Sequence, residues 1–335
     1  MKVLVTGAAG FLGSHVCERL HELGHYVVGV DNFLGGEVGN IHLRTEFHEA
    51  DCRNFDDMLR IMQGIDVVFH AAATAHEGLS VFSPSFITKN IYEASVATMS
   101  AAVAANVKRF VFCSSMARYG NNQAPFHEHM TPQPVDPYAV AKVAAEDTLK
   151  ILSSVHGMEY NIVVPHNIVG PRQCYTDPYR NVMSIMLNRT LQGLPIYIYG
   201  DGTQVRCFSY VDECVDCIIP VLFDEKIVGE IINIGPDHGE VSINDLADMI
   251  LLEMNGNHIR PIHLPGRPQE VHHANCSAAK ARYLLNYQTK YSIQHCITET
   301  INWIKTNGPK PFNYFVDLEI INDEDSEEYG DFEDE

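Results

Sequence analysis

A glycine pattern at the start of the chain constrains the fold more than any other feature. In MKVLVTGAAGFLGSHVCERL, Gly7, Gly10 and Gly13 follow the β-branched run 2–6 and open an amphipathic helical pattern. The first glycine of such a pattern permits a tight turn, the second lets the backbone approach a pyrophosphate, and the third lets the helix pack close to the sheet. The start of the helix adds amide donors and a positive dipole end. This context predicts a dinucleotide-binding βαβ unit.

The pattern that follows extends this unit into a larger domain. Helical segments begin near Phe11, Phe55, Ser85 and Tyr138, and they alternate with short β-branched or apolar runs. These strand-like runs lie at 2–6, 26–31, 45–51, 67–70, 109–114 and 160–165. Such alternation is typical of a parallel sheet with helices on both faces. We therefore expect an α/β fold with a Rossmann-type doubly wound parallel sheet over residues 1–170.

Beyond Pro171 the regular alternation ends. Loops rich in Gly and Pro alternate with helical patches at 181–192 and 212–223. We expect a smaller substrate-binding lobe over residues 171–310, interleaved with the last strands of the main sheet. No internal repeat is visible.

The end of the chain is strongly acidic. Of the 43 acidic residues, eleven lie within 317–335, which contains no Lys or Arg. A segment with few apolar groups and mutually repelling charges cannot bury a core. Residues 311–335 are thus expected to form a disordered, solvating extension, with an interaction tail as the alternative. The formal net charge of −20 gives no indication of nucleic-acid binding.

Cysteine usage and hydropathy indicate the compartment. The nine cysteines are an odd number and are scattered, which favours reduced thiols and a cytoplasmic location. Cys214 and Cys217 are the only close pair, and no second pair follows at metal-site spacing, so no metal site is expected. Neither a signal peptide nor an apolar run of membrane-spanning length is visible, and no membrane association is expected.

Two carboxylates bear on the choice of dinucleotide. Asp31 ends the second expected strand, 18 residues after Gly13, where it would accept hydrogen bonds from adenosine ribose hydroxyls. It would repel a 2′-phosphate, and no Lys or Arg follows before Arg44, so NAD is favoured over NADP. Asp51 ends the third expected strand and is interpreted either as a contact to the adenine edge or as the N-cap of the next helix.

Tyr138 and Lys142 indicate the chemistry. At i and i+4 they share one helix face, so the lysine ammonium can lower the pKa of the phenol from its usual value of about 10. The tyrosine would then serve as a proton acceptor; a surface pair is the alternative. Upstream, KRFVFCSSMARYG reads as a buried strand that ends in Ser114 and Ser115, at the carboxyl edge of the sheet where open α/β sheets bind ligands.

Seven ordered motifs carry a family resemblance over about residues 1–305: TGAAGFLG, HAAA, SSMARYG, DPYAVAK, PHNIVGPRQ, YGDGTQVRCFSYVDE and GRPQEV. In this order they resemble the extended short-chain dehydrogenases/reductases, and most closely their UDP-glucose 4-epimerase branch. The resemblance implies epimerisation at C4 of a UDP-hexose through a 4-keto intermediate, with NAD recycled in each turnover. Relatives pair the helices that correspond to 85–105 and 138–154, whose apolar content exceeds what one sheet face requires, so a homodimer is expected.

The same resemblance implies the site residues. Ser115, Tyr138 and Lys142 match the catalytic positions. Positions that match cofactor contacts are Gly7, Gly10, Phe11, Leu12, Gly13, Asp31, Asn32, Asp51, Cys52, Ala71, Ala72, Asn90, Tyr138, Lys142 and Pro165. Positions that match contacts to the nucleotide sugar are Ser115, Met116, Asn167, Asn181, Val182, Tyr197, Arg206, Arg267, Glu270 and Ala274. Arginines suit a diphosphate and a carboxylate suits a ribose diol, although each arginine has a structural ion pair as its alternative.

Single positions distinguish the expected 4-epimerase from other functions on this fold. Sugar 4,6-dehydratases place an acid pair after the catalytic hydroxyl residue, whereas Met116 and Ala117 follow Ser115 here. A 3,5-epimerase would need a cysteine after the serines, and Cys113 precedes them. The presence of all three catalytic positions disfavours a non-catalytic NAD-binding sensor. A UDP-glucuronate 4-epimerase or decarboxylase stays open.

The width of the sugar pocket is the last expectation. In the resembled epimerases the position of Ala274 helps to set this width, and a methyl side chain leaves room for an N-acetyl group. UDP-GlcNAc and UDP-GalNAc are therefore expected as substrates beside UDP-Glc and UDP-Gal, unless Arg118, His272 or His273 closes the gap. Arg118 is also expected to affect substrate choice. His76 and Glu77 either face the sugar or form a solvated loop pair.

Overall fold

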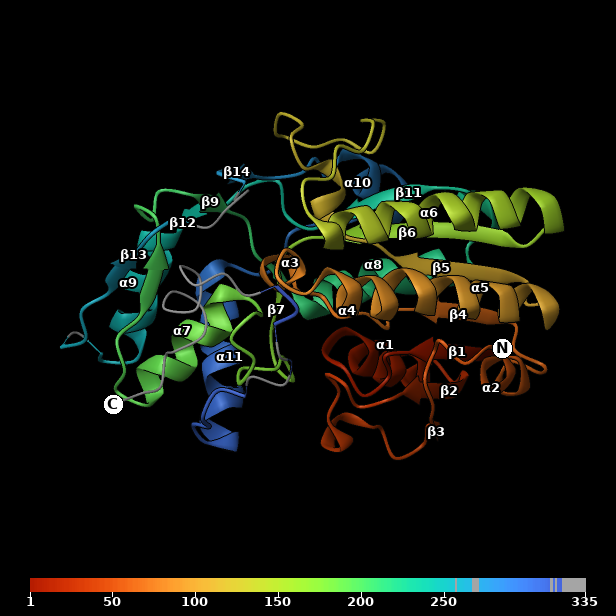
Figure 1. Cartoon of the computed structure of the whole chain (residues 1–335), viewed down its shortest axis with the longest axis horizontal. Coiled ribbons are helices and arrows are strands. Elements are labelled where there is room, and N and C mark those ends of the chain that lie inside the picture. Colours follow the sequence, from red (N-terminus) through yellow and green to blue (C-terminus); the bar gives the residue numbers. More distant parts are fainter. Residues whose placement is uncertain (257, 267–270, 314–315, 317, 321–335) are drawn as a thin grey trace.

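The chain folds into a sheet-centred domain with a smaller lobe at one end. A computed structural model describes residues 1–256, 258–266, 271–313, 316 and 318–320. In Figure 1 the main sheet with its helices occupies the right of the view, and the lobe with α7, α9 and α11 occupies the left. The expected α/β architecture is confirmed.

Seven parallel strands form the main sheet in the order β11-β6-β5-β4-β1-β2-β3. The strand order reverses at β1, which pairs with β2 on one side and with β4 on the other. This reversal opens a crevice at the carboxyl ends of β1 and β4, where doubly wound sheets bind ligands. The strands are β1 (Lys2–Thr6), β2 (Tyr26–Asp31), β3 (Glu46–Glu49), β4 (Val67–His70), β5 (Arg109–Cys113), β6 (Glu159–Pro165) and β11 (Ile231–Ile234).

Helices cover both faces of this sheet because successive strand residues point to opposite sides. On one face, α1 (Phe11–Glu22) packs along α8 (Val211–Phe223), with Val3 and Val5 beneath them. On the other face lie α2 (Phe55–Ile61), α5 (Ala94–Ala104) and α6 (Pro137–His156), over Leu4 and Val28.

Segments from beyond residue 170 complete the sheet domain. Besides strand β11, helix α8 belongs to its core, and α10 (Ala279–Leu285) contacts both of them. The chain therefore crosses between the two parts several times. Cys214 and Cys217 lie buried in α8 among the apolar side chains of this core.

The lobe has an apolar core of its own. It is formed by α7 (Val182–Leu191), α9 (Ile243–Glu253) and α11 (Ile293–Asn307), with Leu187, Leu246 and Ile297 buried among them. Short strands form small sheets outside the main sheet. They are β7 (Ile168–Val169) with β10 (Ser209–Tyr210), β8 (Tyr197–Tyr199) with β13 (Ile262–Leu264), and β9 (Val205–Arg206) between β12 (Val241–Ser242) and β14 (His273–Ala274).

The helical region expected at 85–105 is irregular at its start. It consists of α4 (Pro84–Thr88), a π-helical turn (Lys89–Glu93) and α5, preceded by the short helix α3 (Glu77–Ser80). Asn90 lies in the π-helical turn, and its amide donates to the Phe86 carbonyl at 2.8 Å. Such turns are frequent at functional sites.

Part of the C-terminal segment contacts the folded body. The amide of Asn313 donates to the Thr176 carbonyl, and the carboxylate of Glu319 accepts from the backbone of α4. Residues 321–335, most of the expected disordered extension, lie outside the described residues, and the expectation stays a prediction. In the described ranges no helix is both long enough and apolar enough to span a membrane.

Candidate active site

A cavity of about 620 Å³ lies at the carboxyl ends of the central strands, where the lobe faces the sheet. Every described residue that was expected at the site lines it. These are Gly7, Gly10, Phe11, Leu12, Gly13, Asp31, Asn32, Asp51, Cys52, Ala71, Ala72, Asn90, Ser115, Met116, Tyr138, Lys142, Pro165, Asn167, Asn181, Val182, Tyr197, Arg206 and Ala274. Arg267 and Glu270 lie outside the described residues. The individual roles stay predictions.

The turn between β1 and α1 has the close approach that its glycines require. Gly7 has a φ of 70°, in the left-handed region. A Cβ on Gly13 would lie 2.1 Å from the Gly7 carbonyl oxygen, so only glycine lets α1 begin this close to the turn. The first turn of α1 faces the cavity through Phe11 and Leu12. Its exposed amide groups suit a pyrophosphate.

Asp31 lies at the end of β2 beside this turn and is almost completely buried. Its carboxylate accepts from the amides of Ala9 at 3.0 Å and Phe33 at 2.8 Å. Burial raises the pKa of Asp31, and the backbone amides oppose that shift. A Cβ on Gly36 would lie 2.9 Å from the carboxylate, so the loop after β2 passes close to Asp31. The negative charge of Asp31 would repel a 2′-phosphate. These residues fit a dinucleotide that carries a free ribose diol.

Asp51 is not the N-cap of α2, so that interpretation is wrong. Asn54 caps the helix by accepting from the Asp57 amide at 3.2 Å, because it immediately precedes the first helical residue. The Asp51 carboxylate instead pairs with Arg53 at 2.6 Å, which lowers the pKa of Asp51. Asp51 lines the cavity, and its contact to the adenine edge stays a prediction.

The catalytic candidates meet where α6 starts. Asp136 caps the helix by accepting from the Ala139 amide at 2.8 Å, and Pro137 occupies the first helical position. This places Tyr138 in the first turn, buried and hydrogen-bonded to Ser115. One turn later, the Lys142 Nζ atom donates to the Cys113 carbonyl at 2.8 Å and lies 6.0 Å from the centre of the Tyr138 ring.

The pKa of Tyr138 differs from expectation. Burial raises it above the usual tyrosine value, and the hydrogen bond from Ser115 only partly opposes this shift. Burial also lowers the pKa of Lys142. The net shift of the Tyr138 pKa in the protein alone is therefore upward, whereas the sequence predicted a lowered value, because desolvation disfavours the charged phenolate. Further positive charge bound in the cavity would favour the phenolate.

Arg118 is a core residue and not part of the cavity wall. Its Nε and Nη2 atoms each lie 2.9 Å from the Glu146 carboxylate, which also accepts from the Ser114 hydroxyl. All three side chains are buried. The expected effect of Arg118 on substrate choice is therefore wrong, because its guanidinium is bound to α6 on the sheet side.

The two histidines beside Ala274 do not close the pocket either. His272 lies 3.0 Å from the Thr203 hydroxyl, and His273 lies 2.9 Å from the Glu240 carboxylate. Neither residue lines the cavity, whereas Ala274 does. In the parallel pair of β14 and β9, Ala274 lies opposite Arg206. The methyl group of Ala274 thus forms this part of the wall.

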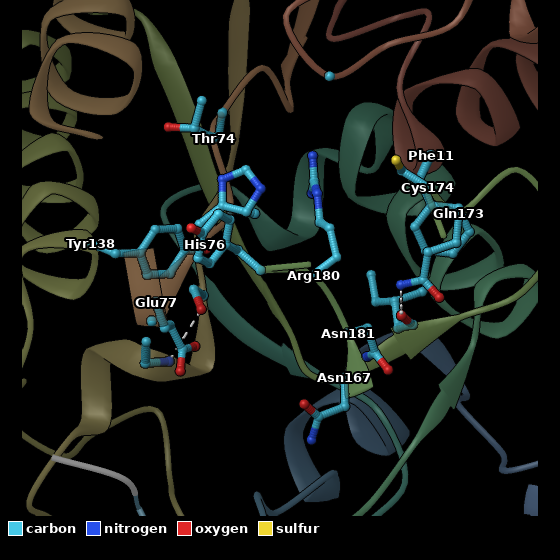
Figure 2. Close-up of a pocket in the computed structure, with 18 of the residues that line it drawn as sticks. Phe11, Thr74, His76, Glu77, Tyr138, Asn167, Gln173, Cys174, Arg180 and Asn181 are labelled. Atoms are coloured by element: carbon cyan, nitrogen blue, oxygen red, sulfur yellow. Dashed lines mark hydrogen bonds between the residues drawn. The ribbon is translucent and has the colours of Figure 1, made fainter. Parts of the chain in front are cut away.

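An ionic cluster lies at the wall of the cavity. The Nε2 atom of His76 lies 2.6 Å from the Asp177 carboxylate, which also accepts from the Nε atom of Arg180 at 3.2 Å. A Cβ on Gly35 would lie 3.0 Å from the Arg180 guanidinium, so this side chain reaches the loop after β2. Figure 2 shows Arg180 between His76 on one side and Gln173 on the other.

This cluster decides one open alternative. His76 is buried, so the interpretation of His76 and Glu77 as a solvated loop pair is wrong for the histidine, although Glu77 is exposed. Both line the cavity. Asp177 and Arg180 were not among the expected site residues, because they lie in an irregular loop whose only sequence signal is its charge.

Side chains of the lobe form the opposite wall. Asn167 adopts a φ of 40°, and Asn181 caps α7 by accepting from the Met183 amide at 3.0 Å. The guanidinium of Arg189 lies 4.0 Å from the centre of the Tyr197 ring. Arg189 lines the cavity but was not expected at the site. Its planar cation on an aromatic ring forms a polar and flat surface suited to a nucleobase or a phosphate.

No metal centre emerges from the described part of the chain. Among those residues, no three His, Cys, Asp or Glu side chains gather closely enough to hold an ion.

Comparisons with known proteins agree with this geometry. The profile of the NAD dependent epimerase/dehydratase family matches residues 3–235. A putative UDP-glucose 4-epimerase of Methanocaldococcus jannaschii is 32% identical over 311 residues, which cover 91% of this chain and 99% of the relative.

Two solved structures have the same fold over nearly their whole length. UDP-glucose 4-epimerase of Thermotoga maritima with UDP-glucose superposes with a TM-score of 0.85 at 32% identity, covering 92% of this chain and 99% of the other. UDP-glucuronic acid 4-epimerase of Bacillus cereus, in complex with UDP-glucuronic acid and NAD, also has a TM-score of 0.85, at 30% identity and with 92% and 100% coverage.

Proposed function

Because the chain belongs to the NAD dependent epimerase/dehydratase family, we propose that it is an NAD-dependent 4-epimerase of UDP-hexoses. The observation that carries the proposal is the meeting of three features in one cavity. The buried Tyr138 and Lys142 and the partly buried Ser115 line the same cavity as the glycine turn at α1 and the wall formed by the lobe. Solved relatives hold UDP-glucose, or UDP-glucuronic acid with NAD.

The glycine turn, Asp31 and the end of α6 would hold NAD. When bound, NAD supplies an acceptor for a hydride from the sugar carbon and later returns the hydride to it. The phenolate form of Tyr138 takes the proton of the C4 hydroxyl, and the resulting phenol gives a proton back to the C4 oxygen at the end. Ser115, hydrogen-bonded to Tyr138, orients the phenol and the substrate oxygen.

Inversion at C4 requires that the 4-keto sugar rotate within the cavity without dissociating from the protein. Contacts to the uridine and diphosphate would retain it during this rotation, with Asn167, Arg206 and Arg189 as candidates on the lobe wall. Arg267 and Glu270 were assigned to the same task from the sequence and stay predictions.

Dehydration is not supported by the residues near Ser115. Met116 and Ala117 begin the short helical turn that follows it, and both line the cavity without an acidic group. No carboxylic acid at this position protonates a departing C6 hydroxyl. Epimerisation needs no such acid.

A UDP-hexuronate substrate is the second candidate, because Arg180 lines the cavity. Its guanidinium is paired on one edge with Asp177 through Nε. A guanidinium has donors on its other edge that suit a carboxylate. The same donors suit a phosphate group of either the cofactor or the substrate, so the hexose stays our first proposal.

We also propose a cytoplasmic homodimer that pairs α5 and α6. The face of α6 carries exposed apolar side chains, with Val140 52%, Ile151 63% and Val155 69% exposed. All nine cysteines are free, in keeping with a reducing compartment. We further propose that the domain over residues 1–170 holds NAD and that the lobe over residues 171–310, together with Ser115, Tyr138 and Asn167, holds the nucleotide sugar.

A substrate panel tests the proposed function. The protein is incubated with NAD and, separately, UDP-Glc, UDP-GlcNAc and UDP-GlcA, and the products are resolved by NMR. Inversion at C4 of the neutral sugars without net change in NADH supports the 4-epimerase. Conversion of UDP-GlcA alone would transfer the assignment to the second candidate, and conversion of none would refute both.

A further inference from the structure

The chain continues past α11 and returns along the wall of the cavity. The carbonyl of Gly308 accepts from the Tyr175 hydroxyl at 2.9 Å, and the carbonyl of Lys310 accepts from the Asn188 amide at 2.9 Å. Asn188 is completely buried in α7 and also binds the Tyr175 carbonyl. The segment is therefore fastened to the lobe by a buried polar residue.

This segment contributes to the cavity itself. Phe312 lines the cavity and lies beside Arg189, whose guanidinium is 5.9 Å from the centre of its ring. The next residue, Asn313, donates its amide to the Thr176 carbonyl at 2.7 Å. Thr176 precedes Asp177, the partner of His76, so the segment also supports the loop that carries the ionic cluster.

Residues 318–320 contact the sheet domain, whereas residues 308–313 contact the lobe. The Glu319 carboxylate accepts from the amides of Ser85 at 2.8 Å and Phe86 at 2.7 Å. Its own amide donates to the Ser83 hydroxyl at 3.3 Å, and the amide of Ile320 donates to the Phe82 carbonyl at 2.9 Å. These bonds fasten the end of the segment to the sheet domain at the start of α4.

Leu318 adds an apolar contact at the same place. It packs against the cluster of buried side chains that contains Leu79, Ile87 and Tyr138. Val81 and Phe82, which directly follow α3, line the cavity. The segment thus touches the lobe wall beside Arg189 and the sheet-domain wall beside Tyr138.

We propose that residues 308–313 and 318–320 form a C-terminal strap that joins the two walls and retains the nucleotide sugar between them. Phe312 and Glu319 are accordingly positioning residues, of which Phe312 borders the ligand and Glu319 fastens the strap. The inference rests on the proposed function for the identity of the ligand. The strap lies beyond about residues 1–305, where the family motifs occur.

Retention follows from the two attachment points. A ligand that contacts both walls dissociates more easily when the walls can separate, and the strap opposes this separation through its hydrogen bonds to α4 and its contact with the Leu79 cluster. Such retention matters for an epimerase, because a 4-keto sugar that escapes during rotation is lost to the reaction. Weakening the strap should therefore raise the rate of dissociation more than the rate of association.

The test measures UDP dissociation from the full-length protein loaded with NAD. The variants are Leu318→Ala and Glu319→Ala, with Asp248→Asn as the control because Asp248 is an exposed carboxylate of α9 that does not line the cavity. We expect each strap variant to raise the UDP dissociation rate about tenfold, which corresponds to about 1.4 kcal/mol. The control should stay at the wild-type rate.

Hydrogen exchange of the peptide 82–90 shows whether the strap has detached. If the strap holds α4 as proposed, both strap variants should show faster exchange in this peptide at an unchanged melting temperature. If the strap detaches but the UDP dissociation rate stays within twofold of the wild-type rate, the proposed role of the strap in ligand retention is overturned. Unchanged exchange in both variants would also overturn it, because the contacts would then not hold α4. Failure of the wild type to bind UDP would instead refute the proposed function.

Discussion

Ala274→Tyr should separate the N-acetylated substrates from the plain hexoses. Ala274 is only 8% exposed, lies on β14 opposite Arg206 and presents its methyl group to the cavity. A phenol ring at this position must extend into the cavity, since β9 and β14 fix the backbone. The ring would occupy the space that an N-acetyl group at C2 requires.

The expected size of this effect follows from overpacking. Inserting a bulky group into filled space costs about 1–3 kcal/mol, and about 1.4 kcal/mol corresponds to a tenfold change in rate. We therefore expect kcat/KM for UDP-GlcNAc to fall by about 5-fold to 150-fold, while kcat/KM for UDP-Glc changes by less than about 3-fold.

The assay compares kcat/KM for both substrates by NMR of the epimerised products. His273→Tyr is the matched control, because it adds a phenol at the next position of the same strand, where the native side chain is exposed and outside the cavity. An equal loss for both substrates would refute the reasoning. So would a wild-type protein that never converts UDP-GlcNAc.

Three further predictions concern catalysis, acid stability and assembly. Tyr138→Phe should lower kcat at least about 100-fold with unchanged melting temperature and NAD content, and a loss of less than tenfold would exclude Tyr138 as the acid/base. Burial lowers the pKa of His70 to about 3 and that of His166 to about 4. Below pH 6.5 the unfolded chain then binds more protons than the folded chain, so each buried histidine should lower the unfolding free energy by about 1.6 kcal/mol between pH 6.5 and 5. His166→Asn should therefore flatten the pH dependence in thermal melts, and an unchanged slope would show that His166 is protonated in the folded chain. Light scattering at micromolar concentration should give a dimer, which Val140→Asp on α6 should dissociate; a monomeric wild type would contradict the helix pairing.

Local patterns predicted the sheet domain well because its elements are regular. The alternation of β-branched runs and helical periods placed six of the seven main strands, from β1 to β6, within a few residues. The spacing of Gly7, Gly10 and Gly13 depends on backbone geometry within a few residues, so the sequence carries it directly. The same holds for Tyr138 and Lys142, which one helical turn brings to one face.

Long-range packing decided the parts that the pattern missed. Helix α8 reads as a helix of the lobe, yet it packs beside α1, because its apolar stripe fits the sheet face that α1 leaves open. Arg118 follows the catalytic serine closely in sequence, but its side chain forms an ion pair with Glu146 on α6. Neither partner is visible from local spacing.

Electrostatics at the site depends on burial, which a sequence does not state. The spacing of Tyr138 and Lys142 predicted a lowered tyrosine pKa, whereas desolvation in the folded chain raises it. The contact of His76 with Asp177 joins residues 101 positions apart, and that of Glu319 with Ser85 joins residues 234 apart. The identity and spacing of the catalytic side chains could therefore be predicted from local sequence. Their protonation and the shape of the cavity around them depend on distant segments that exclude water only in the folded chain.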